Sequence, residues 1–132
     1  AISSQKYAKS GLASEQLDSY KKRLVKLMAE QKVYLDPEIT LRSLAQMVGC
    51  SINHLSQAVN SGFSMSFFDF LNSYRIDVAK SILLNQSSLS KSILDVSFAS
   101  GFNSNSAFYA AFKKSTGQTP AQFRRSIQGL SK

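Results

Sequence analysis

Few side chains in this 132-residue sequence could support covalent or metal chemistry. Cys50 is its single cysteine and His54 its single histidine. One cysteine excludes an internal disulfide and fits a reducing cytoplasm. A catalytic or metal-binding role for His54 would need partners at suitable spacing, and the sequence places none there. We therefore expect Cys50 to be a buried structural thiol, and we expect hydrogen bonding and charge to carry the chemistry of this chain.

The charged residues are unevenly distributed along the chain. Lysine and arginine number 16 against eight aspartates and glutamates, which gives a net charge of +8. Residues 1–32 carry a net charge of +4 and residues 113–132 one of +5, whereas residues 33–79 carry −2 and residues 80–112 carry +1. Positive charge near both ends suits contact with phosphate groups, although on charge alone a merely soluble basic protein remains an alternative.

Length and composition indicate one globular domain or two very small ones fused together. Apolar residues make up 43% and charged residues 18%, which are ordinary values for a folded chain. No apolar run approaches the roughly 18 residues of a membrane span, and no signal peptide is visible. The chain begins at Ala1 without a methionine, so we expect it to be either a fragment excised from a longer protein or a trimmed form of one.

A short apolar pattern occurs twice in the chain. From Leu41 it reads Leu-x-x-Leu-Ala-x-x-x-Gly-Cys-Ser, and from Ile93 it reads Ile-x-x-Val-Ser-x-x-x-Gly-Phe-Asn. In each copy a second apolar stretch follows the glycine, Gly49 or Gly101. A short amphipathic helix, a glycine-containing turn and a second helix form the helix-turn-helix unit, whose second helix can enter the major groove of DNA. Two such units in one small basic chain predict a sequence-specific DNA-binding domain.

Capping residues and apolar periodicity predict helices throughout and no sheet. We expect a linker over residues 1–13, a first helix-turn-helix subdomain over 14–65, a connecting helix over 66–84 and a second subdomain with a basic tail over 85–132. At about 1.5 Å per residue the connecting helix would be roughly 27 Å long. The predicted helix caps are Ser14, Thr40, Ser51, Ser66, Ser92 and Thr119, the last followed by Pro120 at the first helical position.

The same residues carry a resemblance to a known family. Residues 101–124 contain Gly-Phe, Ser-x-Phe, Phe-Lys-Lys, Thr-Gly and Thr-Pro-x-x-Phe-Arg in the order and spacing that resemble the signature of the AraC family of bacterial transcription regulators. The resemblance covers about residues 17–125. In the first unit it rests on Leu41-x-x-Leu44-Ala45, Ser51-x-x-His54-Leu55 and Phe70-Leu71-Asn72-x-x-Arg75-x-x-x-Ala79.

The resemblance implies an all-α domain of about seven helices, in which a long helix joins two helix-turn-helix subdomains. Family members place both recognition helices in successive major-groove segments, and a rod of about 27 Å suits two readers roughly 34 Å apart. The family pattern also makes His54 a packing residue. The sequence departs from the family where Val59-Asn60 and Phe63-Ser64 replace the usual Phe-Lys and Thr-Gly. The first unit therefore lacks the lysine that is usual in the family at this position, and we expect it to bind phosphate less strongly.

Matched to the family residue by residue, two sets of polar side chains face outward on the recognition helices. Asparagine and glutamine can bond bidentately to adenine, and serine is permissive. Neither set contains an arginine, so the usual arginine contact to guanine is missing. Solvated polar surface is the alternative for these side chains. The predicted base-reading residues are Asn53, Ser56, Gln57, Asn105, Ser106 and Tyr109.

Contacts to phosphate are predicted from cationic side chains and from helix N-termini, whose N–H groups bind anions. The predicted phosphate-binding residues are Thr40, Ser92, Lys113, Lys114, Thr119, Arg124 and Arg125. The cationic run of residues 21–26 is instead expected to form a solvated helix face. We expect no metal ion and no cofactor.

The expected partner is double-stranded DNA at a promoter, with RNA polymerase and a sensory N-terminal region as further partners. We expect no enzymatic activity and no membrane contact from this segment. Residues 6–12 and 34–37 resemble a branch in which the DNA-binding domain follows a membrane-embedded or other sensory part, so the segment would lie in the cytoplasm. Two alternatives remain: an RNA- or protein-interaction module without sequence-specific DNA readout, and a DNA alkyl-transfer repair domain, which would need more cysteines than Cys50.

Overall fold

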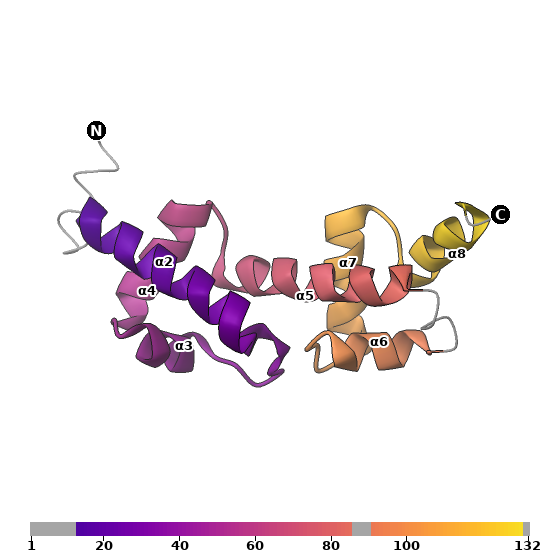
Figure 1. Cartoon of the computed structure of the whole chain (residues 1–132), viewed down its shortest axis with the longest axis horizontal. Helices are drawn as coiled ribbons and strands as arrows, with labels where there is room; N and C mark the ends of the chain where they lie inside the picture. The colour runs from indigo at the N-terminus through magenta and orange to yellow at the C-terminus, as the bar shows by residue number, and fades with distance from the viewer. Residues whose placement is uncertain (1–12, 86–90, 131–132) are drawn as a thin grey trace. The chain divides into compact units, whose positions relative to one another are not determined.

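The computed structural model describes residues 13–85 and 91–130, and all regular structure in them is helical (Figure 1). The predicted all-α fold is therefore confirmed. The predicted linker over residues 1–13 lies, apart from Ala13, outside the described residues. The described residues form seven α-helices and one 3-10 helix: α2 (Ser14–Gln31), η1 (Val33–Leu35), α3 (Leu41–Val48), α4 (Ile52–Phe63), α5 (Phe67–Leu84), α6 (Ile93–Ala99), α7 (Asn105–Thr116) and α8 (Pro120–Leu130).

The chain packs as two compact units. Among the described residues, the first comprises 13–33 and Ile39–Phe70, and the second comprises Tyr34–Glu38, 71–85 and 91–130. The boundary therefore falls inside α5, and five residues that precede α3 belong to the second unit. Both points differ from the limits expected from the sequence. Periodicity predicts that residues 66–84 form a helix, but it does not indicate which core each turn of that helix joins.

In the first unit α2 packs against α4 and α3, and α3 packs against α4. Leu24 and Met28 are four residues apart on α2, so they lie on one face, and both are buried. Full burial of such a side chain contributes about 1.5–3 kcal/mol. The buried apolar side chains of this unit include Leu24, Met28, Val33, Leu44, Ala45, Val48, Leu55, Ala58, Val59 and Phe70.

The turn between α3 and α4 forms as the sequence predicts. Gly49 has φ +88°, a left-handed conformation that other residues adopt only with strain. Thr40 Oγ1 accepts the N–H of Ser43 at 3.0 Å, which caps α3. Ser51 Oγ accepts the N–H of His54 at 3.0 Å, which caps α4. Local hydrogen bonds and one glycine therefore define where the second helix of this unit begins.

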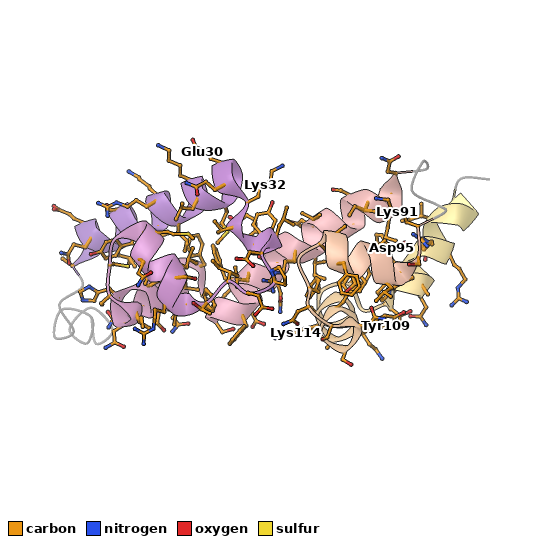
Figure 2. The ribbon with its side chains drawn as sticks, turned by 90° about the horizontal axis from the view of Figure 1, so that it is seen from below. Glu30, Lys32, Lys91, Asp95, Tyr109 and Lys114 are labelled. Atoms are coloured by element: carbon orange, nitrogen blue, oxygen red, sulfur yellow. The ribbon has the colours of Figure 1, made fainter. Side chains whose placement is uncertain are left out.

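The second unit uses the same kind of capping. Ser92 Oγ accepts the N–H of Asp95 at 3.0 Å, and Asp95 accepts the N–H of Ser92 at 3.3 Å, so the predicted cap Ser92 is confirmed as part of a reciprocal capping box with an acid. Figure 2 shows Asp95 and Lys91 near the start of α6. Thr119 Oγ1 accepts the N–H of Gln122 at 3.1 Å and caps α8, which begins at Pro120 as predicted.

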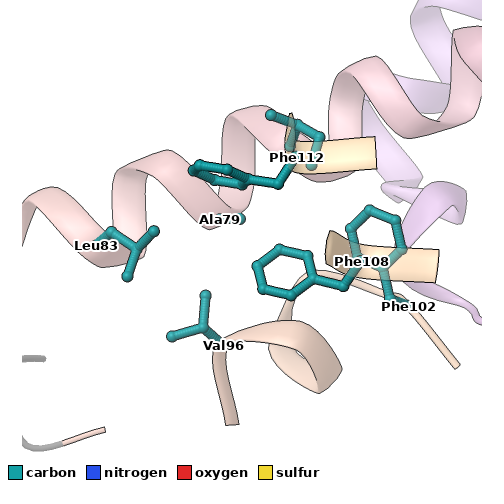
Figure 3. Close-up of a cluster of buried hydrophobic side chains, with 7 residues drawn as sticks. Ala79, Leu83, Val96, Phe102, Phe108 and Phe112 are labelled. Atoms are coloured by element: carbon teal, nitrogen blue, oxygen red, sulfur yellow. The ribbon is translucent and has the colours of Figure 1, made fainter. Parts of the chain in front are cut away.

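Phenylalanines dominate the core of the second unit (Figure 3). Phe108 meets Phe102 with ring centroids 5.2 Å apart and Phe112 at 5.7 Å, and Phe112 meets Phe123 of α8 at 5.3 Å. Tilted and edge-to-face pairs at such distances add about 0.5–1.5 kcal/mol each beyond area burial. The core comprises Ile76, Ala79, Leu83, Val96, Phe102, Phe108 and Phe112.

One predicted cap is wrong. Ser14 is the first residue of α2, and Ala13 occupies the position before it without a side-chain bond to the helix. The side chain of Gln16 instead accepts the N–H of Ala13 at 3.3 Å. Since Ser14 already has helical geometry, its hydroxyl is one residue too late to cap the helix.

Candidate nucleic-acid interface

The first candidate reading surface is the solvent side of α4. Asn53 is exposed, whereas Ser56 and Gln57 are half-buried. Positions 53, 56 and 57 share one helix face because residues three and four apart are neighbours on a helix. The opposite face carries the buried side chains Leu55, Ala58 and Val59. Packing therefore determines which face of α4 is turned toward solvent.

The second candidate reading surface is the corresponding side of α7. Asn105, Ser106 and Tyr109 are all exposed, and Tyr109 has 37% of its surface accessible. The buried residues Phe108 and Phe112 hold an adjacent face of the helix against the core. Tyr109 meets Phe108 edge-on at 6.1 Å, so its ring rests on the core while remaining accessible (Figure 2). This surface is more open than that of α4.

The four cations near the C-terminus fall into two groups. Lys113, Lys114 and Arg125 have more accessible side chains, with Lys113 and Lys114 exposed and Arg125 at the surface of α8. Arg124 is half-buried, and its Nη1 donates to the main-chain carbonyl of Lys91 at 2.6 Å. That bond ties α8 to the segment before α6. The predicted contact of Arg124 with phosphate therefore competes with a structural role that the sequence did not indicate.

The three helix N-termini predicted to bind phosphate differ in the charge near them. The hydroxyls of Thr40, Ser92 and Thr119 all accept an N–H from their own helix, as caps do. At the start of α6 the carboxylate of Asp95 already occupies the positive end of the helix. A phosphate there would meet a like charge. The starts of α3 and α8 lack such an acid in the first turn and are better suited to bind phosphate.

His54 and Cys50, the single histidine and the single cysteine of the chain, both lie against neighbouring side chains. His54 stacks against Tyr20 with ring centroids 6.2 Å apart. Cys50 is half-buried, less than predicted; burial raises the pKa of its thiol, and the nearby charge of Arg23 opposes that rise. Across residues 13–85 and 91–130, no three His, Cys, Asp or Glu side chains lie together as a metal site would require. No helix in the described part of the chain is long and apolar enough to cross a membrane.

Two arginines have roles that sequence reasoning missed. Arg23, expected on a solvated basic face, donates from Nη1 to the carbonyl of Val48 at 3.0 Å, at the C-terminal end of α3. Arg75 is buried in the second unit. Burial lowers the pKa of its guanidinium, and Asp36 opposes this effect, although arginine stays charged at neutral pH. The burial of Arg75 could have been predicted from helical spacing, because Arg75 follows the buried Leu71 by four residues and so shares its face of the helix.

A family model described as a helix-turn-helix domain matches residues 44–126. An uncharacterized HTH-type transcriptional regulator of Staphylococcus aureus is 33% identical over 93 residues, which are 70% of this chain and 12% of that protein. The melibiose operon regulatory protein of Escherichia coli is 29% identical over 93 residues, which are 70% of this chain and 30% of that protein. The chain thus spans a small part of the length of these relatives.

Solved structures show the same fold. The C-terminal domain of AraT, a response regulator from Geobacillus stearothermophilus, superposes with a TM-score of 0.69 at 27% identity over 82% of this chain and 84% of that one. The C-terminal domain of the two-component response regulator yesN from Fusobacterium nucleatum gives a TM-score of 0.68 at 27% identity, over 79% of this chain and 96% of that one. Both similarities extend over most of the two units described above.

Proposed function

The chain belongs to the AraC family of helix-turn-helix transcription regulators, and we propose that it reads two successive major-groove segments of duplex DNA, one with α4 and one with α7. The observation that supports this proposal most is the group of exposed polar side chains on α7, Asn105, Ser106 and Tyr109, beside the buried Phe108 and Phe112 that anchor the helix. In a helix-turn-helix unit the residues of the second helix reach the base edges.

The proposed base preference is for A·T pairs. The amides of Asn53, Gln57 and Asn105 can bond bidentately to adenine N6 and N7, and each good pair gives about 1–3 kcal/mol of discrimination. The two faces carry different residues, so one chain would read two unlike half-sites about 10 bp apart. The accessible cations Lys113, Lys114 and Arg125 would contact phosphate and contribute affinity without sequence information.

Selection of bound sites from random duplex DNA tests this proposal. The expected motif has two unlike half-sites with A·T pairs at both cores. Asn105→Ala should relax the preference in one half-site and leave the other unchanged. A palindromic motif, guanine-rich cores or an unaltered preference of Asn105→Ala would contradict the proposed reading. Tighter binding of RNA than of duplex DNA in competition would favour the alternative of an RNA-binding module.

The proposed partners beyond DNA follow from the family. We propose that the chain works in the cytoplasm as the DNA-binding part of a longer regulator, with a sensory region preceding it and RNA polymerase as its target at a promoter. The small share of the relatives' length that the chain spans supports a further region. We propose no catalytic activity, and the absence of methyl transfer to Cys50 from alkylated duplex DNA would exclude the repair alternative.

A further inference from the structure

The second unit contains a segment that is distant in sequence from its helices. Tyr34–Glu38, here called the strap, precedes α3 in the chain but packs in the second unit. Arg75 of α5 holds it: Nε donates to the carbonyl of Tyr34 at 2.7 Å, and Nη2 donates to the carbonyl of Asp36 at 3.1 Å. Arg75 is only 9% exposed, so its guanidinium depends on these acceptors, because a buried charge without partners is costly.

The strap lies directly against the turn between α6 and α7. A Cβ built on Gly101 would stand 2.5 Å from the carbonyl oxygen of Tyr34 and 2.9 Å from the Cα of Leu35. Both are main-chain atoms, which cannot move aside as the end of a flexible side chain could. The ring of Tyr34 also stacks on that of Tyr74 of α5, with centroids 5.2 Å apart. The position of the strap and that of the turn are therefore coupled.

A chain of contacts continues from the turn to the reading helix. The guanidinium of Arg75 lies 5.7 Å from the ring centroid of Phe102, the residue after Gly101. Phe102 in turn packs against Phe108 of α7. A shift of the strap would therefore reach the helix that carries Asn105 through close-packed groups.

The turn of the first unit is built differently. Gly49 has almost the same backbone conformation as Gly101, with φ +88° against +93°. A Cβ added to Gly49 would have the Nη1 atom of Arg23 as its nearest neighbour at 3.6 Å, which is a side-chain contact at ordinary distance. The first turn thus provides a comparison for the second, with a similar glycine and an arginine nearby but no main-chain segment pressed against the glycine.

We propose that Arg75 is a positioning residue for DNA readout: by holding the strap against the Gly101 turn, it fixes how α7 presents Asn105 and Tyr109 to the bases. The proposal rests on the proposed function, since it concerns the accuracy of base contacts made by α7. Bidentate contacts require good alignment of both hydrogen bonds, so a small displacement of α7 costs selectivity before it costs phosphate binding.

The decisive experiment compares half-site preferences in the full chain. Arg75→Met removes both donors, Arg75→Lys keeps the charge with a different donor geometry, and Gly101→Ala pushes the strap away from the turn. The half-site of α7 is the one that Asn105→Ala relaxes. All three variants should weaken selectivity there, by about tenfold for Arg75→Met, and leave the other half-site unchanged.

Matched controls separate positioning from loss of stability. Arg23→Met and Gly49→Ala make the same changes beside the first turn, and Leu83→Ala weakens the core of the second unit at a position outside the strap. At protein concentrations that compensate for unfolding, all three should keep the selectivity of the α7 half-site. If Arg75→Met kept it too, or if Leu83→Ala lost it equally, the proposal would be overturned.

A measurement without DNA distinguishes failure of this proposal from failure of the proposed function. Amide hydrogen exchange of Arg75→Lys should accelerate at the Gly101 turn and in the first turns of α7, whereas Leu83→Ala should accelerate exchange throughout the second unit. Uniform acceleration in both variants would overturn the proposal. A wild-type chain without base preference, but with this local exchange pattern, would refute the proposed function and leave the mechanical coupling established.

Discussion

At the scale of single residues, the buried neighbours on α4 and α7 help to decide which side chains stay exposed. Tyr109 follows the fully buried Phe108 directly, so the helical step of about 100° places Tyr109 at the edge of the core, where its ring contacts Phe108 and 37% of its surface stays accessible. Asn105 lies on nearly the same side of α7 as Phe108, three residues later, but it is the first residue of the helix and its side chain is exposed. Substituting an exposed position should therefore change binding, whereas substituting a buried one should change stability.

Lys113 and Arg124 provide a test of that distinction. We expect Lys113→Ala to change stability by less than about 0.5 kcal/mol and to reduce the slope of log K against log salt by about 0.9, as loss of one phosphate contact does. Arg124→Ala should destabilise the chain by about 0.5–1.5 kcal/mol, because the hydrogen bond that ties α8 to the carbonyl of Lys91 is lost. Urea unfolding and salt titrations of DNA binding measure the two effects. Equal stability of the two variants would contradict the structural role of Arg124.

Cys50 provides a second test at this scale. Burial raises the pKa of its thiol, so less thiolate forms at pH values near 8 than in a free cysteine, and alkylation by iodoacetamide should be slower than that of a cysteine peptide. Since the folded-state pKa is raised, the contribution of Cys50 to stability is full below the unfolded-state pKa and is lost as the pH rises through the folded-state value. Arg23→Ala should slow alkylation further, because Arg23 favours the thiolate. Alkylation as fast as that of the peptide would show that burial does not control this thiol.

At the scale of the elements, three glycines of similar conformation occupy different surroundings. Gly49, Gly101 and Gly117 have φ +88°, +93° and +78°. A Cβ on Gly117 would meet nothing within 4 Å, one on Gly49 would meet a side chain at 3.6 Å, and one on Gly101 would overlap main-chain atoms. Among these three positions, Gly101 alone is one where an added Cβ would cause both backbone strain and a steric clash.

Alanine at these three positions should therefore have graded effects on stability. Gly117→Ala should cost about 1–2 kcal/mol, which is the strain of the left-handed conformation alone. Gly49→Ala should cost about the same, and Gly101→Ala should cost roughly a further 1–3 kcal/mol because the strap or the turn must move. Thermal or urea unfolding gives all three values. The interpretation of the strap contact would be wrong if Gly101→Ala were no less stable than Gly117→Ala.

At the scale of the whole molecule, the chain passes between the two units three times: after Val33, after Glu38 and within α5 after Phe70. A helix that continues from one unit into the other, and a strap that leaves the first unit before the chain returns to it, link the folding of both. Neither unit is therefore a contiguous stretch of the sequence.

We accordingly expect the two units to unfold in one cooperative transition. Leu55→Ala, in the core of the first unit, should destabilise the chain by about 2–5 kcal/mol and should lower the unfolding midpoint reported by probes in the second unit as well. Amide exchange resolved by residue, or coincident melting of probes in each unit, measures this coupling. Two separate transitions, with only the first shifted by Leu55→Ala, would show that the units are independent.

The helices, most of their caps and both turns of this protein could be predicted from local sequence. These features depend on residues within four positions of one another, such as Thr40 with Ser43 or Ser92 with Asp95, and on glycines whose backbone freedom is intrinsic. The family landmarks likewise occur at fixed local spacing. Periodicity and resemblance were therefore enough to predict the all-helical fold and the polar faces of α4 and α7.

The roles of Arg23, Arg75 and Arg124 became apparent from the folded chain alone. Their acceptors are main-chain carbonyls 25, 41 and 33 residues away, and every residue type offers the same carbonyl, so no sequence pattern indicates which one an arginine will reach. The strap and the division of α5 between two cores could not be predicted for the same reason. Contacts between distant segments depend on the packing of the whole chain, and that packing places the strap against the turn before α7.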